Sequence, residues 1–494
     1  TARHEEIPAW DDMPAELKPV LARQMEIYAG FLEQTDYEVG RVLDAIDSLG
    51  ALDDTLVFYI IGDNGASAEG TPVGCFNEMT TLNGMPGIET TEFLMSKIDD
   101  FGTPEAYNHY AVGWAHALCT PYQWTKQVAS HWGGTRNGTI VRWGNGLGDG
   151  GGIRHQFHHV IDIVPTILEA AGIPAPQSVN GITQAPLEGV SMLGSLRSAD
   201  APETHDVQYF EIMGNRGIYF QGWTAVTKHR TPWKMAAPLP FDEDVWELYG
   251  PGDWTQSRDL SKEQPEQLAY LQRLWLIEAT KYGVVPLDDR TVERIIPELS
   301  GRPSLIKGTS QLMFSGMRLA EAAVISVKNR SHAVTAEIDV PDGGANGVIV
   351  TQGGLAGGWA LYVHEKKLTY CYNFFGIDYY VTSAEKEIPA GRHQVRMEFA
   401  YDGGGLAQGG DITLFYDGEP VGTGRVDRTQ PVGFSADEAC DVGRDTGSSP
   451  SPDYRPGTSA FTGTIAWVEI DTGDDDHDHL VTAEDRLRIA MGKQ

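Results

Sequence analysis

A long helical stripe followed closely by an apolar strand limits the folds open to this chain more than any other feature. Between Pro14 and Leu49, apolar residues recur mostly at three- and four-residue steps, a spacing that predicts a helix with one face on a sheet. The stripe consists of Met25, Tyr28, Leu32, Val39, Val42, Leu43 and Ile46. Gly50 predicts the end of this helix, and the run from Leu56 to Ile61 predicts a strand. Together they form an αβ unit, which favours an α/β domain.

The predicted strand is followed at once by polar residues, Asp63-Asn64-Gly65. In open α/β sheets, ligands gather outside the carboxyl ends of the strands, so this position indicates a site. Carboxylate and amide oxygens suit Ca²⁺ or Mg²⁺. The alternative is a plain strand-to-loop turn, because Asp, Asn and Gly also favour turns.

Several further segments of the sequence support the interpretation of Asp63-Asn64-Gly65 as a metal site. In chain order they are Tyr107-Asn108-His109-Tyr110, Trp114-Ala115, Thr120 to Gln127, His131 to Gly138, His159 to Thr166, Trp246-Glu247-Leu248-Tyr249 and Asp288-Asp289-Arg290. With the Asp-Asn-Gly turn, these segments resemble the sulfatase family of the alkaline-phosphatase-like superfamily, and bacterial arylsulfatases in particular. The resemblance covers roughly residues 1 to 300 in the right order.

The resemblance implies a fold and a set of site residues. The fold is an alkaline-phosphatase-like α/β sheet with helices on both faces, present here in part. Asp63 and Asn64 would bind Ca²⁺, with Mg²⁺ as the second option. Lys126 stands where the family has the lysine that contacts the substrate sulfate. His131 and Arg136, close by in the sequence, are candidates for lining the pocket.

The family's nucleophile is not found in this chain. Sulfatases use a formylglycine made from the first residue of Cys/Ser-x-Pro-x-Arg, and its hydrated aldehyde attacks sulfur. Cys119-Thr120-Pro121-Tyr122-Gln123 comes near, but Gln123 replaces the arginine and the segment follows the Asp-Asn-Gly strand instead of preceding it. We therefore expect Cys119 to be an ordinary buried thiol. Asp11-Asp12 resembles the family's first metal motif, but Pro8 argues against a central strand before it.

These gaps predict the carboxy-terminal portion of a longer hydrolase that cleaves a sulfate-ester small molecule or a sulfated glycan. The formylglycine would lie in the missing amino-terminal part, and this chain alone should have no turnover. Two alternatives stay open: a phosphomonoester or phosphodiester hydrolase of the same superfamily, and a non-catalytic glycan-binding protein. His158 and His159 are expected to be structural.

Patterning changes after about Gly301, which sets the expected domain organisation. Short alternating strands such as Ala333 to Val340, separated by glycine-rich turns, predict an all-β sandwich. Its outline resembles laminin-G or concanavalin-like domains. The expected domains are residues 1–200 for the α/β part, 201–310 for a smaller α+β subdomain, 315–475 for the sandwich and 476–494 for an acidic tail.

Two further segments and the net charge complete the predictions. Gly70 to Ala106 shows little periodicity and predicts a long excursion, a lid or binding loop. The acidic run Gly473 to His479 predicts a solvated segment more than a metal site. With 37 basic and 69 acidic residues, the net charge of −32 excludes broad binding to nucleic acid, which needs a basic face. The sequence contains no run of about 18 apolar residues, so it predicts no membrane-spanning helix. The compartment stays open, with the periplasm or secretion as possibilities.

Overall fold

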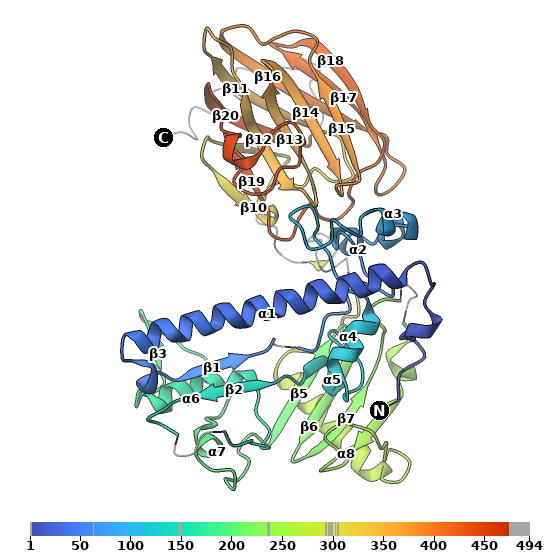
Figure 1. Cartoon of the computed structure of the whole chain (residues 1–494), viewed down its shortest axis with the longest axis vertical. Helices are drawn as coiled ribbons and strands as arrows, with labels where there is room; N and C mark the ends of the chain where they lie inside the picture. Colours follow the sequence, from blue (N-terminus) through green and yellow to red (C-terminus); the bar gives the residue numbers. More distant parts are fainter. Residues whose placement is uncertain are drawn as a thin grey trace. The chain divides into compact units, whose positions relative to one another are not determined.

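The computed structural model describes residues 2–62, 64–147, 151–234, 238–291, 294, 300–301, 303 and 306–473. The chain divides into two compact units (Figure 1). The first unit contains residues 1–74 and 110–290, and the second contains residues 75–109 and 291–494. The chain thus leaves the first unit at residue 74, returns at residue 110 and leaves again after residue 290.

The first unit begins with the predicted helix. The helix α1 (Lys18–Ser48) follows the short 3-10 helix η1 (Trp10–Asp12), so Asp11 and Asp12 lie ahead of the first long helix and not at the end of a strand. The predicted strand forms as β1 (Val57–Ile60) and pairs antiparallel with β2 (Thr139–Arg142), with Ile60 opposite Thr139. Further short elements follow: η2 (Leu52–Asp54), α4 (Val112–Cys119), α5 (Trp132–Thr135), η4 (Val160–Asp162), α6 (Ile163–Ala170), β3 (Ser178–Val179), β4 (Ile182–Thr183) and α7 (Leu193–Arg197).

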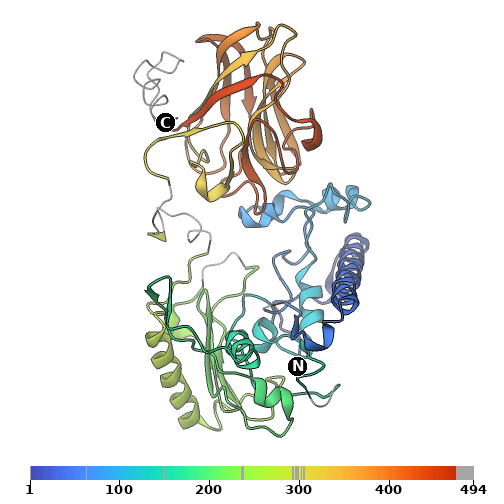
Figure 2. The same ribbon diagram turned by 90° about the vertical axis from the view of Figure 1, so that its left-hand side faces the viewer.

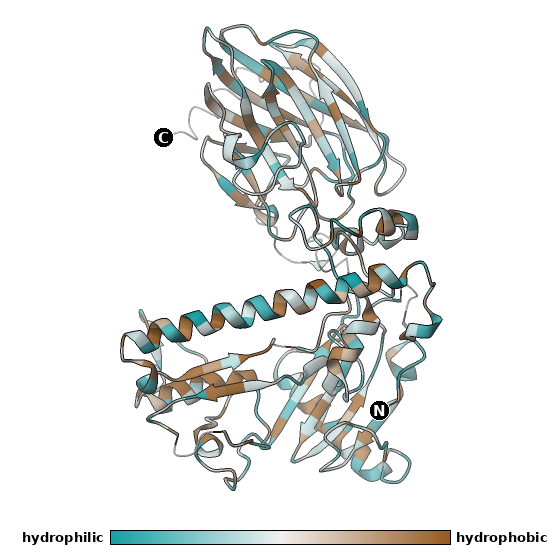
Figure 3. Cartoon of the chain, in the orientation of Figure 1, coloured by the Kyte–Doolittle hydropathy of each residue, from teal (hydrophilic) through white to brown (hydrophobic). Residues whose placement is uncertain are grey.

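Much of the apolar surface around α1, β1, β2 and α6 is uncovered. On α1 only Val20, Leu21 and Gln24 are buried, whereas Phe31 is 65% and Val42 is 60% exposed. Exposed apolar side chains also include Ile60, Ile61, Ile140, Val164 and Ile167. Figure 3 shows the brown, apolar parts of β1 and β2. Soluble monomers rarely expose so many large apolar side chains together. The predicted helix is correct, but the part of the chain that the structure describes supplies only a two-stranded ribbon instead of a sheet to cover its stripe.

A four-stranded antiparallel sheet forms the second part of this unit. Its order is β5 (Val207–Ile212), β6 (Asn215–Phe220), β7 (Trp223–Thr227) and β8 (Trp246–Tyr249). The helix α8 (Pro265–Lys281) packs on one face of this sheet, as Figure 2 shows at its lower left. The core consists of Ile218, Ala225, Leu248, Leu271, Trp275 and Ala279. This is a small α+β arrangement in the region where the sequence predicts an α+β subdomain.

The second unit contains a β-sandwich of two six-stranded sheets. One sheet has the order β10 (Arg318–Ala320), β19 (Ala439–Val442), β12 (Gly347–Gly354), β13 (Gly357–His364), β14 (Lys367–Phe374) and β15 (Asp378–Ser383). The other has the order β18 (Glu419–Val426), β17 (Gly410–Tyr416), β16 (Gly391–Tyr401), β11 (His332–Val340), β20 (Thr464–Asp471) and β9 (Ser310–Met313). Alternating residues of β11 and β16, such as Val334, Ala336, Val395 and Met397, fill the core between the sheets. The predicted all-β sandwich is confirmed.

Residues 75–109 pack against this sandwich. They form α2 (Met79–Leu82), η3 (Pro86–Ile88) and α3 (Thr91–Ser96) instead of an irregular excursion. Met79 belongs to the sandwich core, and the Asn77 side chain donates to the carbonyls of Ala356 (2.8 Å) and Phe375 (2.9 Å). The Asn83 side chain donates to Gly433 O and accepts from Val432 N. The segment is therefore an integral part of the second unit. The acidic run after Gly473 and the predicted tail lie outside the described residues.

Candidate functional site

Two loops that are about sixty residues apart in the sequence meet at the end of β1. The Gly65 amide donates to Gly134 O (3.1 Å), and the Lys126 amide donates to Ala66 O (3.1 Å). Only glycine fits at position 65, because a Cβ there would lie 1.6 Å from Gly133 O. The fold thus places the turn after Asn64 directly against the loop that carries Lys126.

The Lys126 side chain pairs with a carboxylate that the sequence analysis does not single out. Its ammonium lies 2.9 Å from Glu69 Oε2, and the Gln127 amide donates to Glu69 Oε1, also at 2.9 Å. The Ser67 hydroxyl donates to Glu69 Oε2 (2.7 Å). Burial tends to raise the pKa of Glu69, but these hydrogen bonds and the Lys126 charge outweigh it and lower that pKa. Glu69 is therefore an ionised carboxylate that accepts three side-chain hydrogen bonds, one of them from Lys126.

The backbone around Lys126 is strained. Trp124 and Gln127 have φ values of 65° and 72°, in the left-handed region that residues other than glycine rarely adopt. The surrounding structure holds them there: Gln127 O accepts from the Asn215 amide at 2.9 Å, and the Trp124 ring is buried and stacks on His4. Strain of this kind collects at functional sites. It adds a signal at Lys126 that sequence patterning does not contain.

The predicted cation site consists of Asp63 and Asn64. Asp63 lies outside the described residues, and Asn64 is described at the start of the turn. Among the residues that the structure describes, no three His, Cys, Asp or Glu side chains gather so that they could hold a metal ion. The described donors therefore do not form a complete cation shell.

The two candidate pocket residues take structural partners. His131 is fully buried, with Nδ1 2.8 Å from the Ser130 hydroxyl and Nε2 3.2 Å from Glu247. Arg136 donates to Trp254 O and lies over the Tyr122 ring, 5.3 Å from its centre. These contacts hold the loop containing Lys126 in place, and a pocket-lining role for His131 and Arg136 remains only a prediction.

Cys119 is buried in the packing of the same loop. Its sulfur accepts from the Ala66 amide (3.2 Å) and lies 3.3 Å from Gly133 O. Burial raises the pKa of the thiol, which disfavours the reactive thiolate. The thiol supports the contact between the two loops.

Asp162 is the centre of a second buried network in the first unit. His205 Nδ1 lies 2.8 Å from Asp162 Oδ1, and the amides of His159 and Val190 donate to the carboxylate. His158 Nε2 lies 2.6 Å from the Ser195 hydroxyl, but Ser195 is buried and donates to Met192 O. A buried hydroxyl in such bonds is not available as a nucleophile. This arrangement agrees with a structural role for these histidines.

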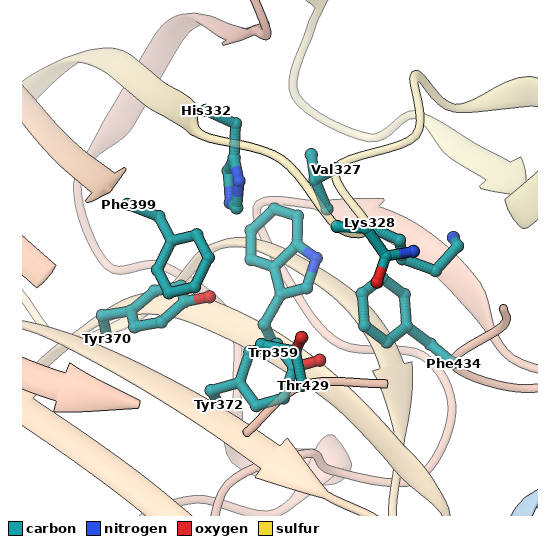
Figure 4. Close-up of a pocket in the computed structure, with 10 residues that line it drawn as sticks. Val327, Lys328, His332, Trp359, Tyr370, Tyr372, Phe399, Thr429 and Phe434 are labelled. Atoms are coloured by element: carbon teal, nitrogen blue, oxygen red, sulfur yellow. The ribbon is translucent and has the colours of Figure 1, made fainter. Parts of the chain in front are cut away.

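The sandwich contains a small cavity, shown in Figure 4. Its aromatic lining includes Trp359, Tyr370, Tyr372, Phe399 and Phe434. The cavity measures about 10 Å³, enough for one water molecule but far too small for a sugar ring. On the outer face of the same sheet, the Tyr362 hydroxyl bonds to Asp453 and the Cys371 thiol donates to Pro450 O. Residues 450–454 therefore cover part of that face.

The amino-terminal part of the chain is similar to known sulfatases. Residues 2–173 match the sulfatase family model. The chain is 28% identical over 287 residues to an uncharacterized sulfatase of Schizosaccharomyces pombe, a match that covers 57% of this chain and 48% of that protein. It is 25% identical over 205 residues to an arylsulfatase of Klebsiella aerogenes, covering 42% of this chain and 40% of that enzyme. The chain thus spans about half the length of these curated relatives.

Solved structures show a weaker likeness. The carbohydrate-binding module CBM40 of the Ruminococcus gnavus sialidase, bound to α2,3-sialyllactose, is 14% identical with a TM-score of 0.24. The match covers 38% of this chain and 99% of that module. A score this low carries no information on what the sandwich binds.

No helix in the described part of the chain is long and apolar enough to cross a membrane. Through the match of residues 2–173 to the family model and through the two relatives, the amino-terminal part of this chain is similar to the sulfatase family.

Proposed function

We propose that the chain supplies the later part of a sulfuric ester hydrolase of the arylsulfatase type, in which Lys126 contacts the sulfate group of the substrate. A lysine ammonium offers a compact positive charge with three N–H donors, and Glu69 uses only part of this capacity. The substrate would be a small sulfate ester or a sulfated glycan.

One observation carries this proposal: the backbone joins the two motifs that the family resemblance assigns to one site. The bonds from Lys126 N to Ala66 O and from Gly65 N to Gly134 O hold the Asn64 turn against the Lys126 loop. Chance similarity of separate short motifs would not require them to meet in space. Ca²⁺ or Mg²⁺ at Asp63 and Asn64 remains an expectation of the resemblance.

Two further observations suggest that the active site is shared with polypeptide outside this sequence. The chain contains no Cys/Ser-x-Pro-x-Arg segment from which formylglycine could be made. The uncovered apolar surface of α1, β1, β2 and α6 also has the character of a core face. We propose that additional strands of the same catalytic domain cover it, which fits a chain spanning about half of its relatives.

The first test is the intact mass and peptide map of the protein from its native source, together with a sulfate-release assay. We expect a species heavier than 54.0 kDa that contains a Cys/Ser-x-Pro-x-Arg peptide, carries formylglycine and releases sulfate. The 494-residue chain alone should release none. Robust turnover by this chain, or a native protein of 54.0 kDa, would contradict the proposal.

A further inference from the structure

We propose that Glu69 sets the charge preference of the Lys126 site, so that monoanionic sulfate esters bind there in preference to dianions such as inorganic sulfate or a phosphate monoester. This inference rests on the proposed role of Lys126 and deepens it. It makes Glu69 a residue that determines specificity, without direct contact with the reacting atoms.

The geometry ties Glu69 firmly to Lys126. The carboxylate receives the Lys126 ammonium, the Gln127 amide and the Ser67 hydroxyl, each within 2.9 Å. Ser67 and Gln127 belong to the two loops that meet after Asn64, so both loops hold the carboxylate. The Glu69 and Lys126 side chains are 27% and 31% exposed, which leaves the pair reachable by a small anion.

The Lys126–Glu69 pair has no net charge, and its affinity for an anion therefore depends on how strongly Glu69 repels that anion. An anion that shares the Lys126 ammonium with Glu69 would lie roughly 6 Å from the carboxylate and be repelled by it. Because Coulomb energy is proportional to charge, a dianion suffers twice the repulsion of a monoanion at the same place. The factor by which Glu69 weakens binding of a dianion is therefore the square of the factor for a monoanion.

The charge difference matters for sulfate-ester hydrolysis in particular. Water and R–O–SO₃⁻ give R–OH, SO₄²⁻ and a proton, so the substrate is a monoanion and the product a dianion near neutral pH. A neutral Lys126–Glu69 pair would hold the ester better, relative to the product, than a lone lysine would. The same effect disfavours dianionic phosphate monoesters, which would be the substrates if the chain belonged to a phosphomonoester hydrolase.

The test uses the full 494-residue chain and two probes, inorganic sulfate and methyl sulfate, which share a sulfate head and differ in charge. Binding is followed by the chemical shifts of ¹³C-labelled lysine side chains at constant low ionic strength. Lys126→Met identifies the Lys126 signal. Glu69→Gln removes the charge with little change in size, and Glu263→Gln is the matched control. Glu263 pairs with Arg258 on an exposed surface, so its removal changes the net charge equally but elsewhere.

At about 6 Å in water, loss of the Glu69 charge should raise methyl sulfate affinity about threefold and inorganic sulfate affinity about tenfold. Glu263→Gln should change neither. Equal gains for both anions, or no gain, would refute the role of Glu69 while leaving Lys126 as an anion contact. If neither anion moves the Lys126 signal in any variant, the sulfate-binding role of Lys126 itself fails, and the inference on Glu69 fails with it.

Discussion

Asn77 offers the sharpest test of how the second unit is built. Its side chain is buried and makes three hydrogen bonds: two donated to Ala356 O and Phe375 O, and one accepted from Met79 N at 3.0 Å. Asn77→Ala would leave these three backbone groups without their partner. At about 1 kcal/mol for each lost bond, the second unit should lose about 3 kcal/mol of stability.

A single unfolding curve would mix the two units, so hydrogen exchange read by mass spectrometry is the suitable assay. The peptides to follow are those of β12 and β14, which lie in the sandwich and not in residues 75–109. Under conditions where exchange requires unfolding of the unit, a 3 kcal/mol loss corresponds to roughly a hundredfold faster exchange.

Asn346→Ala is the control, because Asn346 lies in the same unit, is exposed and accepts one bond from Lys366 N. It should cost less than about 1 kcal/mol. If Asn77→Ala speeds exchange only within residues 75–109 and leaves β12 and β14 unchanged, the segment is an appendage and the reasoning is wrong.

Three further predictions concern buried polar groups. Burial raises the pKa of Glu89 to about 7, above its ordinary value of 4.5, so the second unit should lose stability as pH rises from about 4.5 through 7, and Glu89→Gln should flatten this dependence in denaturation followed at several pH values. Although burial opposes ionisation of Asp162, the nearby His158 imidazole and the hydrogen bond with His205 hold the pKa of Asp162 below the ordinary value. Asp162→Asn should therefore cost the first unit about 3 kcal/mol near pH 6, with a smaller difference below about pH 4, measured by hydrogen exchange of α6. The buried Tyr370 hydroxyl has no hydrogen-bond partner among the described residues, so Tyr370→Phe should leave the thermal midpoint unchanged or higher; a clear drop would reveal a bound water in the cavity.

Local patterns predict the elements well where one period dominates. The stripe between Pro14 and Leu49 became α1 (Lys18–Ser48), and Leu56 to Ile61 became β1 (Val57–Ile60). Alternation with glycine-rich turns likewise predicted the sandwich strands, since the side-chain period of two is directly visible in the sequence. What covers the α1 stripe could not be predicted, because that depends on strands that the described residues do not supply.

The site was predictable only where a motif is continuous. Asn64 and Lys126 are found by family resemblance, and the structure brings their loops together. Glu69 was missed, because a single glutamate in a polar turn has no pattern until its partner is known. The packing of residues 75–109 was missed for a similar reason: Asn83 and Gly433 are 350 residues apart, and nothing local relates them.

The same separation has a consequence for biosynthesis. Residues 75–109 leave the ribosome long before the residues Val432, Gly433 and Asp437 that they contact. At about 5–20 residues per second, the segment waits roughly 15–70 s for these partner residues. During that interval Met79 and Asn77 have no sandwich to enter, so the nascent chain offers a chaperone-binding or protease-sensitive stretch in its first quarter. Slow codons after residue 110 would lengthen that exposure and lower the yield without changing any residue of the folded sandwich.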